Sequence, residues 1–299
     1  MKKLIILGVI YLFLVIGCKK NNQEQPIPQK KDISKKVSPS RSIRNMEDAA
    51  YLHNLVIQKA ITKYSDSNQV NFTNYEDFRN EIDQFSFNSM KELCGLDSAT
   101  IKGIEQEKNN RNNQNDVRYQ ITKKGFTKFV DENVYPMLEN LKNDTKISQK
   151  EVDMVHKLLE EIKVSNHKIR NSDGTLNQQE IQKLGIFLNA MKDEYQKEQF
   201  DLEANQGVIA GYGIYIGLNS YKLFLENGDI DLIIPLPSEN NEIMVAPWII
   251  DLGGGIIGAG IAYHKGADMF EGAFWGCLFN SAGAARLIGR GAIRLLTGK

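Results

Sequence analysis

The chain has 299 residues, with 37 basic and 37 acidic side chains and three cysteines. This length allows one to three domains, and three cysteines are too few for a fold built on disulfides. The balanced charge, with no basic face on the body of the chain, excludes a typical nucleic-acid-binding protein.

A short apolar segment opens the chain. Lys2 and Lys3 precede an uninterrupted apolar run over residues 4–16, and Gly17 follows. A basic start, an apolar centre and a small residue before the cleavage point are typical of a secretory signal, so we expect residues 1–17 to be a signal peptide. The run is too short to span a bilayer, which takes about 20 apolar residues.

The end of this segment, Val15-Ile16-Gly17-Cys18, resembles the lipobox of bacterial lipoproteins. In that family signal peptidase II cuts before the cysteine, which carries lipid. The resemblance therefore implies that Cys18 becomes the acylated first residue, and that the protein binds the membrane through this anchor. An aspartate after the cysteine often retains such proteins at the inner membrane. Lys19 stands there, which implies the outer membrane, facing either side. The alternatives are an ordinary cleaved signal and an N-terminal anchor helix.

The segment after the lipobox, residues 18–45, is polar and basic. Positions 19–45 carry eight basic and two acidic side chains, whereas the rest of the mature chain carries 27 basic and 35 acidic ones. With almost no apolar content the segment is expected to be a disordered tether. A solvated linker is the plain interpretation, and contact of its lysines with anionic lipid is the alternative.

Helical signals dominate residues 46–226, for which we predict a helical domain. Capping patterns occur at Asn45, Thr73, Ser148 and Asn177, and Thr73 and Ser148 each begin a capping box. Apolar residues then recur every three or four positions, which is typical of helices that pack on other helices. We expect a loop over 105–116, a helix over 117–141 bent at Pro136, and a helix from Asn177 continuing past residue 199 into the apolar stretch 207–225.

Residues 227–247 break the helical pattern. Pro235, Pro237 and Pro247 exclude a long helix, and Asn227-Gly228 is a turn signal. We predict a loop or a short hairpin between residues 230–236 and 243–246.

The C-terminal segment, residues 248–299, contains two rows of small residues spaced four apart. The rows are Gly254, Gly258, Ala262 and Gly266, and Gly272, Gly276, Asn280 and Ala284. Such rows let two helix backbones approach closely, whereas a glycine costs an exposed helix about 1 kcal/mol relative to alanine. The packing partner must therefore exist. We predict a Gly/Ala-rich apolar helical hairpin, with apolar centres at 248–262 and 273–288.

The residues around the hairpin are compatible with more than one packing partner. Trp248 and Tyr263 bracket the first segment as interfacial aromatic residues would, and Arg286, Arg290 and Arg294 form a basic stripe near the C-terminus that suits lipid phosphates. The apolar centres are short for spanning a bilayer. Insertion in a membrane or self-association is one expectation, and packing on the helical body is the other.

Together, these features resemble bacterial lipoproteins of Bacteroidota and, more loosely, the two-helix glycine-zipper domain of the 17-kDa surface antigen family. The resemblance rests on Cys18 and on the Gly/Ala-rich stretch from about 250 to 290. It implies an all-α protein, a lipid-tethered helical bundle followed by the hairpin, with a non-enzymatic role in the cell envelope. A membrane-active bacteriocin-like toxin and a hydrolase with an unrecognised site are the alternatives.

No pattern of catalytic or metal-binding residues supports an enzyme. The stretch from Asn171 to Glu180 is similar to a calcium loop, but Ile169 occupies its first ligand position. Asp153, His156 and Glu160 share a helix face, but no second such motif completes a metal site. We therefore predict no cofactor, no metal and no small-molecule substrate. Cys94 and Cys277 are expected to be free, buried thiols rather than a disulfide.

Overall fold

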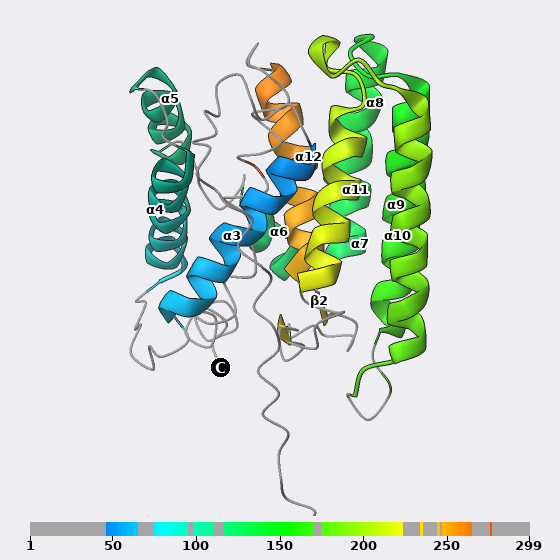
Figure 1. Cartoon of the computed structure of the whole chain (residues 1–299), viewed down its shortest axis with the longest axis horizontal. Coiled ribbons are helices and arrows are strands. Elements are labelled where there is room, and N and C mark those ends of the chain that lie inside the picture. Colours follow the sequence, from blue (N-terminus) through cyan, green and yellow to red (C-terminus); the bar gives the residue numbers. More distant parts are fainter. Residues whose placement is uncertain are drawn as a thin grey trace, which may run out of the picture. The chain divides into compact units, whose positions relative to one another are not determined.

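The computed structural model describes residues 46–64, 74–94, 98–109, 116–169, 171, 175–223, 234–235, 244–245, 247–264 and 276, and these residues are mostly helical. The helices are α3 (Met46–Tyr64), α4 (Tyr75–Cys94), α5 (Ser98–Asn109), α6 (Val117–Lys124), α7 (Phe126–Phe129), α8 (Tyr135–Asn143), α9 (Gln149–Lys168), α10 (Gln178–Glu198), α11 (Val208–Tyr221) and α12 (Pro247–His264) (Figure 1). A π-helical turn, η1 (Val130–Val134), precedes α8, and a 3₁₀ turn, η2 (Leu202–Ala204), precedes α11. The expected signal peptide, the tether and Cys18 lie outside the described residues.

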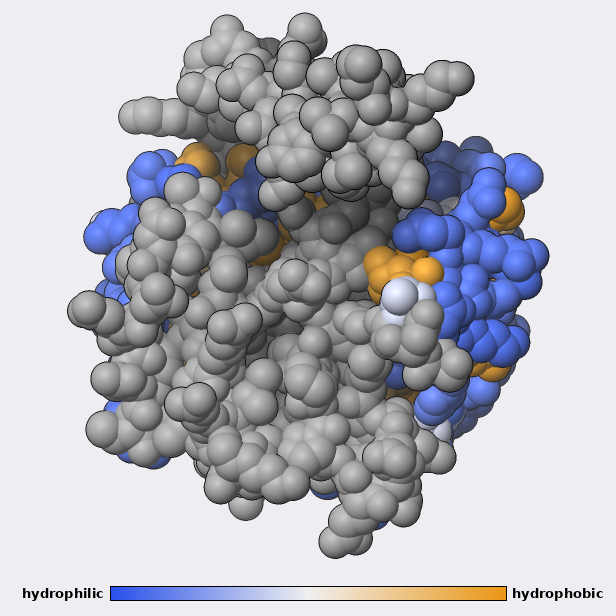
Figure 2. All heavy atoms as spheres, turned by 90° about the horizontal axis from the view of Figure 1, so that it is seen from below, coloured by the Kyte–Doolittle hydropathy of each residue, from blue (hydrophilic) through white to orange (hydrophobic). Residues whose placement is uncertain are grey.

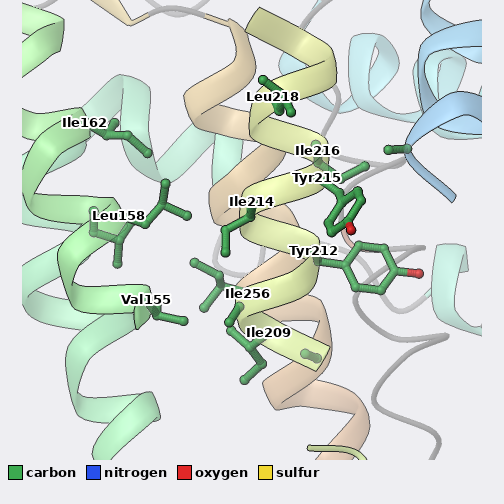
Figure 3. Close-up of a cluster of buried hydrophobic side chains, with 14 of the residues drawn as sticks. Val155, Leu158, Ile162, Ile209, Tyr212, Ile214, Tyr215, Ile216, Leu218 and Ile256 are labelled. Carbon is green, nitrogen blue, oxygen red and sulfur yellow. The ribbon is translucent and has the colours of Figure 1, made fainter. Parts of the chain in front are cut away.

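The core is organised around α11. Val208–Tyr221 contains no charged residue, and all of its side chains except that of Asn219 are buried. A helix that is apolar all round is stable in water only when other elements cover every face. Here α3, α9, α10 and α12 pack against it, and in Figure 1 α11 (yellow) runs beside α12 (orange). Figure 3 shows Val155, Leu158 and Ile162 of α9 directed at this core.

Helices α10 and α11 fit each other through two reciprocal contacts between a glycine and a tyrosine. A Cβ atom on Gly185 of α10 would lie 2.5 Å from Cζ of Tyr221 on α11. A Cβ atom on Gly211 of α11 would lie 2.6 Å from the hydroxyl of Tyr195 on α10. Each helix therefore carries a glycine that makes room for the other helix's aromatic ring, which lets the two backbones approach closely.

Two of the expected helix caps are confirmed, and one lies a residue later than predicted. Ser148 Oγ accepts from the backbone N–H of Glu151 at 3.1 Å, and Asn177 Oδ1 accepts from that of Glu180 at 3.2 Å. At α4 the cap is Asn74, not Thr73, because Asn74 Oδ1 accepts from the backbone N–H of Asp77 at 2.9 Å. Asparagine is a better N-cap than threonine, so the helix begins at Tyr75. Asn45 lies outside the described residues.

The predicted helix over 117–141 is interrupted at Gly125, and a π-helical turn precedes Pro136, the residue where a bend was predicted. Gly125 has a φ of +84°, a conformation that glycine adopts without steric cost, and it separates α6 from α7. Pro136 lies at the start of α8, directly after the π-helical turn. This wide turn accommodates the proline ring, which lacks an N–H and crowds the carbonyl four residues earlier.

Two other boundaries differ from expectation. Residues 105–109, predicted to be loop, form the end of α5, because exposed Glu and Gln side chains favour a helix as long as nothing breaks it. Helix α10 does not continue past residue 199. It ends at Glu198, and Gln199 turns the chain with a φ of +50°. The predicted short hairpin is present as two-residue strands, in which Ile234 pairs with Val245 and Pro235 with Met244.

Candidate functional site

The first candidate site is the set of small residues in the C-terminal segment that are predicted to pack closely on another helix. The structure describes some of these residues. Gly254, Gly258 and Ala262 lie on α12, and Gly276 is described as well. The remaining candidates lie outside the described residues: Cys18, Gly266, Gly272, Ala284, Arg286, Arg290 and Arg294.

The structure brings Gly276 directly against the backbone of α12. A Cβ atom on Gly276 would overlap the carbonyl oxygen of Gly254 and lie 2.7 Å from Cα of Gly258. These are backbone atoms, which cannot rotate away as a side chain would. Three glycines that the sequence places in two separate rows therefore meet at one point.

Two further glycines of α12 face other helices of the body. A Cβ atom on Gly253 would lie 3.1 Å from Cγ1 of Val117 on α6, and one on Gly260 would lie 2.9 Å from Cγ of Met137 on α8. These two glycines were not predicted as packing positions, because they fall outside the four-residue spacing. Helix α12 packs mainly on α11 and also contacts α6 and α8. Among the described residues, no helix is both long enough and apolar enough to cross a membrane.

A second candidate is the polar cluster formed by Asp131, Tyr135, His156, Glu160 and Lys163. The His156 ring stacks on that of Tyr135, with centroids 4.1 Å apart, and the Tyr135 hydroxyl donates to Glu160. Lys163 Nζ donates to both Asp131 and Glu160 at 2.8 Å. These contacts join η1 and α8 to α9.

The charged side chains of this cluster pair with one another. Burial raises the pKa of Tyr135 to about 12, so its hydroxyl keeps its proton at neutral pH. Hydrogen bonds from Lys163 and then Tyr135 lower the pKa of Glu160, which stays ionised. Asp153 accepts from Gln149 instead of joining the cluster. In the described part of the chain, no three His, Cys, Asp or Glu side chains are placed to hold a metal ion.

The third candidate is Glu151, a fully buried carboxyl group on α9. Its oxygens accept from the backbone N–H groups of Gly207 at 2.8 Å, Ile209 at 2.8 Å and Ala210 at 3.4 Å, at the start of α11. The sequence pattern assigned Glu151 to the capping box of its own helix. Its carboxyl group instead caps a helix more than 50 residues away in sequence, where the first N–H groups have no partner within the helix.

The described residues form no extended apolar patch on the surface that could serve as a binding site. On the face in Figure 2 the described residues are mainly hydrophilic, with small separate hydrophobic spots. The most exposed large apolar side chains of the described residues are Tyr51, Val164 and Ile186. Single exposed apolar residues of this kind are normal on a protein surface.

Comparison of the chain with models of protein families, with curated proteins and with solved structures finds no match.

Proposed function

We propose that the protein is a non-enzymatic lipoprotein of the cell envelope, held at the outer membrane by an acyl group on Cys18. The observation that carries this proposal is the order of the first residues: two lysines, the apolar run 4–16 and then Gly17-Cys18. A secretory signal that ends at a lipobox cysteine leads the chain to the envelope and supplies a site for lipid. In this proposal residues 18–45 are the tether, and the lipid-tethered helical bundle follows.

The described contacts of the C-terminal segment support a hairpin that packs on the body of the same chain. Gly276 lies against Gly254 and Gly258, and Gly253 and Gly260 lie against α6 and α8. These contacts give the glycine-rich helix the close partners that it needs, because an exposed helix of this composition would be unstable. We therefore propose packing within the molecule, rather than membrane insertion or self-association, as the role of the hairpin.

The anchor is tested by labelling a bacterial host that expresses the full chain with an alkyne fatty acid. We expect the wild-type protein to carry label and to lose its leader. Cys18→Ser should abolish the label and retain the leader, since the resemblance implies that both steps need this cysteine. Cys94→Ser and Cys277→Ser are the matched controls, because they remove the other thiols and should leave labelling unchanged. Label that persists on the Cys18→Ser protein would refute the proposal.

The role of the hairpin is tested separately with purified protein and liposomes of bacterial phospholipid. Protein that has not been acylated, produced without residues 1–18, should neither bind the liposomes nor release an enclosed dye. Liposome binding or leakage by this protein would favour a membrane-active C-terminal segment, whatever the outcome at Cys18.

A further inference from the structure

Met137 on α8 fills the space beside Gly260 of α12. A Cβ atom on Gly260 would lie 2.9 Å from Cγ and 3.1 Å from Cε of Met137, and it would overlap the sulfur atom between them. The three atoms nearest to that position all belong to Met137. The thioether therefore takes the place that a side chain at position 260 would occupy, and the glycine lets it approach the helix backbone.

This contact completes the packing around one turn of α12. Gly260 and the neighbouring Ala259 are buried, and so is Ile256, one turn earlier. Methionine suits an irregular gap of this kind, because its side chain is unbranched and flexible. The fit depends on a sulfur atom that is apolar and carries no further substituent.

Met137 is also accessible to solvent, unlike the methionines of the core. Met46, Met90, Met154 and Met191 are at most 5% exposed, whereas Met137 is half-buried and packs against the core from outside it. A small oxidant dissolved in water therefore reaches Met137 before it reaches the other methionines whose burial the structure describes.

Peroxide converts a methionine to its sulfoxide by transfer of one oxygen atom. The O–O bond breaks and an S=O bond forms, so the sulfur loses two electrons and hydrogen peroxide is reduced to water. The product is polar and carries an additional atom on the sulfur. At Met137 this oxygen either presses on the backbone at Gly260 or makes the side chain swing into water. In both cases the space beside Gly260 loses its apolar filling.

We propose that Met137 is an oxidative modification site, at which peroxide loosens the packing of α12 on the body. The inference rests on the proposed function, in which the glycine-rich hairpin packs on the same chain. Sulfoxide formation at Met137 weakens the contact between α8 and α12, and reduction of the sulfoxide restores the fit.

The test is limited oxidation with hydrogen peroxide of the full chain, purified as a bacterial host produces it. Peptide mass spectrometry should find Met137 as its sulfoxide before the four core methionines. Amide hydrogen exchange over residues 253–262 of α12 should then become about 5–30-fold faster, as expected when a polar group is forced into an apolar contact. The amides of α10, which packs on α9 and α11, should change much less.

Two variants separate Met137 from the other oxidisable groups. Met137→Leu keeps an apolar side chain of similar volume and cannot form a sulfoxide, so peroxide should no longer accelerate exchange in α12. Met154→Leu is the matched control, because Met154 lies in the core at 2% exposed, and this variant should respond to peroxide as the wild type does. Acceleration that survives in Met137→Leu would assign the effect to a thiol or another methionine and overturn the proposal.

Reversal keeps the proposal testable if Met137→Leu fails to fold. The two methionine sulfoxide reductases, one for each sulfoxide epimer, should restore slow exchange in α12 of the oxidised wild type. If α12 exchanges as fast as an unfolded chain before oxidation, the proposed packing of the hairpin is wrong as well. If α12 stays protected with Met137 oxidised, or if Met137 resists peroxide that oxidises free methionine, this inference alone is wrong.

Discussion

Replacing Gly211 by alanine tests how tightly α10 and α11 fit together. The added methyl group would lie 2.6 Å from the Tyr195 hydroxyl and 2.8 Å from Cε of Met46, both far inside van der Waals contact. Tyr195 and Met46 are both buried in the core, so we expect a shift of either side chain to disturb its neighbours. Overpacking of this kind costs about 1–3 kcal/mol, which exceeds the gain of about 0.4–1 kcal/mol that alanine brings to a helix.

Gly217→Ala is the matched control on the same helix. Its new methyl group would meet only Leu188 Cδ2, at 3.8 Å, which is ordinary contact. We expect this variant to be more stable than the wild type by about 0.4–1 kcal/mol. Gly211→Ala should be less stable than the wild type by up to about 2.6 kcal/mol, the overpacking cost less the helix gain. Both values come from urea unfolding followed by circular dichroism. If the two variants unfold at the same urea concentration, the inferred close fit does not exist.

Three further variants probe other contacts, each by thermal or urea unfolding. Gly276→Ala should destabilise the protein by about 1–3 kcal/mol or more, because the backbone of Gly254 and Gly258 cannot yield; an unchanged melting temperature would argue against this contact. Asn177→Ala should cost about 1 kcal/mol through loss of the α10 cap, with Asn177→Ser largely retaining stability, and equal losses in both would contradict the capping role. Leu158→Ala, at a fully buried site, should cost about 2–5 kcal/mol; a loss below about 1 kcal/mol would show that the core is not packed as described.

The sequence predicted those features that depend on neighbouring residues. Ser148 and Asn177 cap helices because their side chains bind N–H groups three residues away, which a local pattern can reveal. The break at Gly125 was not predicted, because one glycine costs a helix interior only about 1 kcal/mol, whereas a proline such as Pro136 costs about 3 kcal/mol.

The features that the sequence did not predict join distant residues. The partners of Glu151 lie 56 to 59 residues away, and nothing in its own helix indicates that it is buried. The close contact of Gly185 on α10 with the Tyr221 ring on α11 also joins residues that are distant in sequence. For the glycine-rich segment, composition indicated that a close partner was needed, but only the contacts of α12 in the structure, with α11, α6, α8 and Gly276, indicate that the partner lies in the same chain.

The position of α11 in the chain has a consequence for biosynthesis. Helix α3 is made early, yet its buried residues such as Val56 pack in the core that α11 completes, and Asn54 donates to the carbonyl of Asn219, 165 residues later. A nascent chain that ends before residue 208 therefore lacks α11, the main packing partner of α3. We expect such a chain to need a chaperone to prevent aggregation, and to fold only after translation has passed Tyr221.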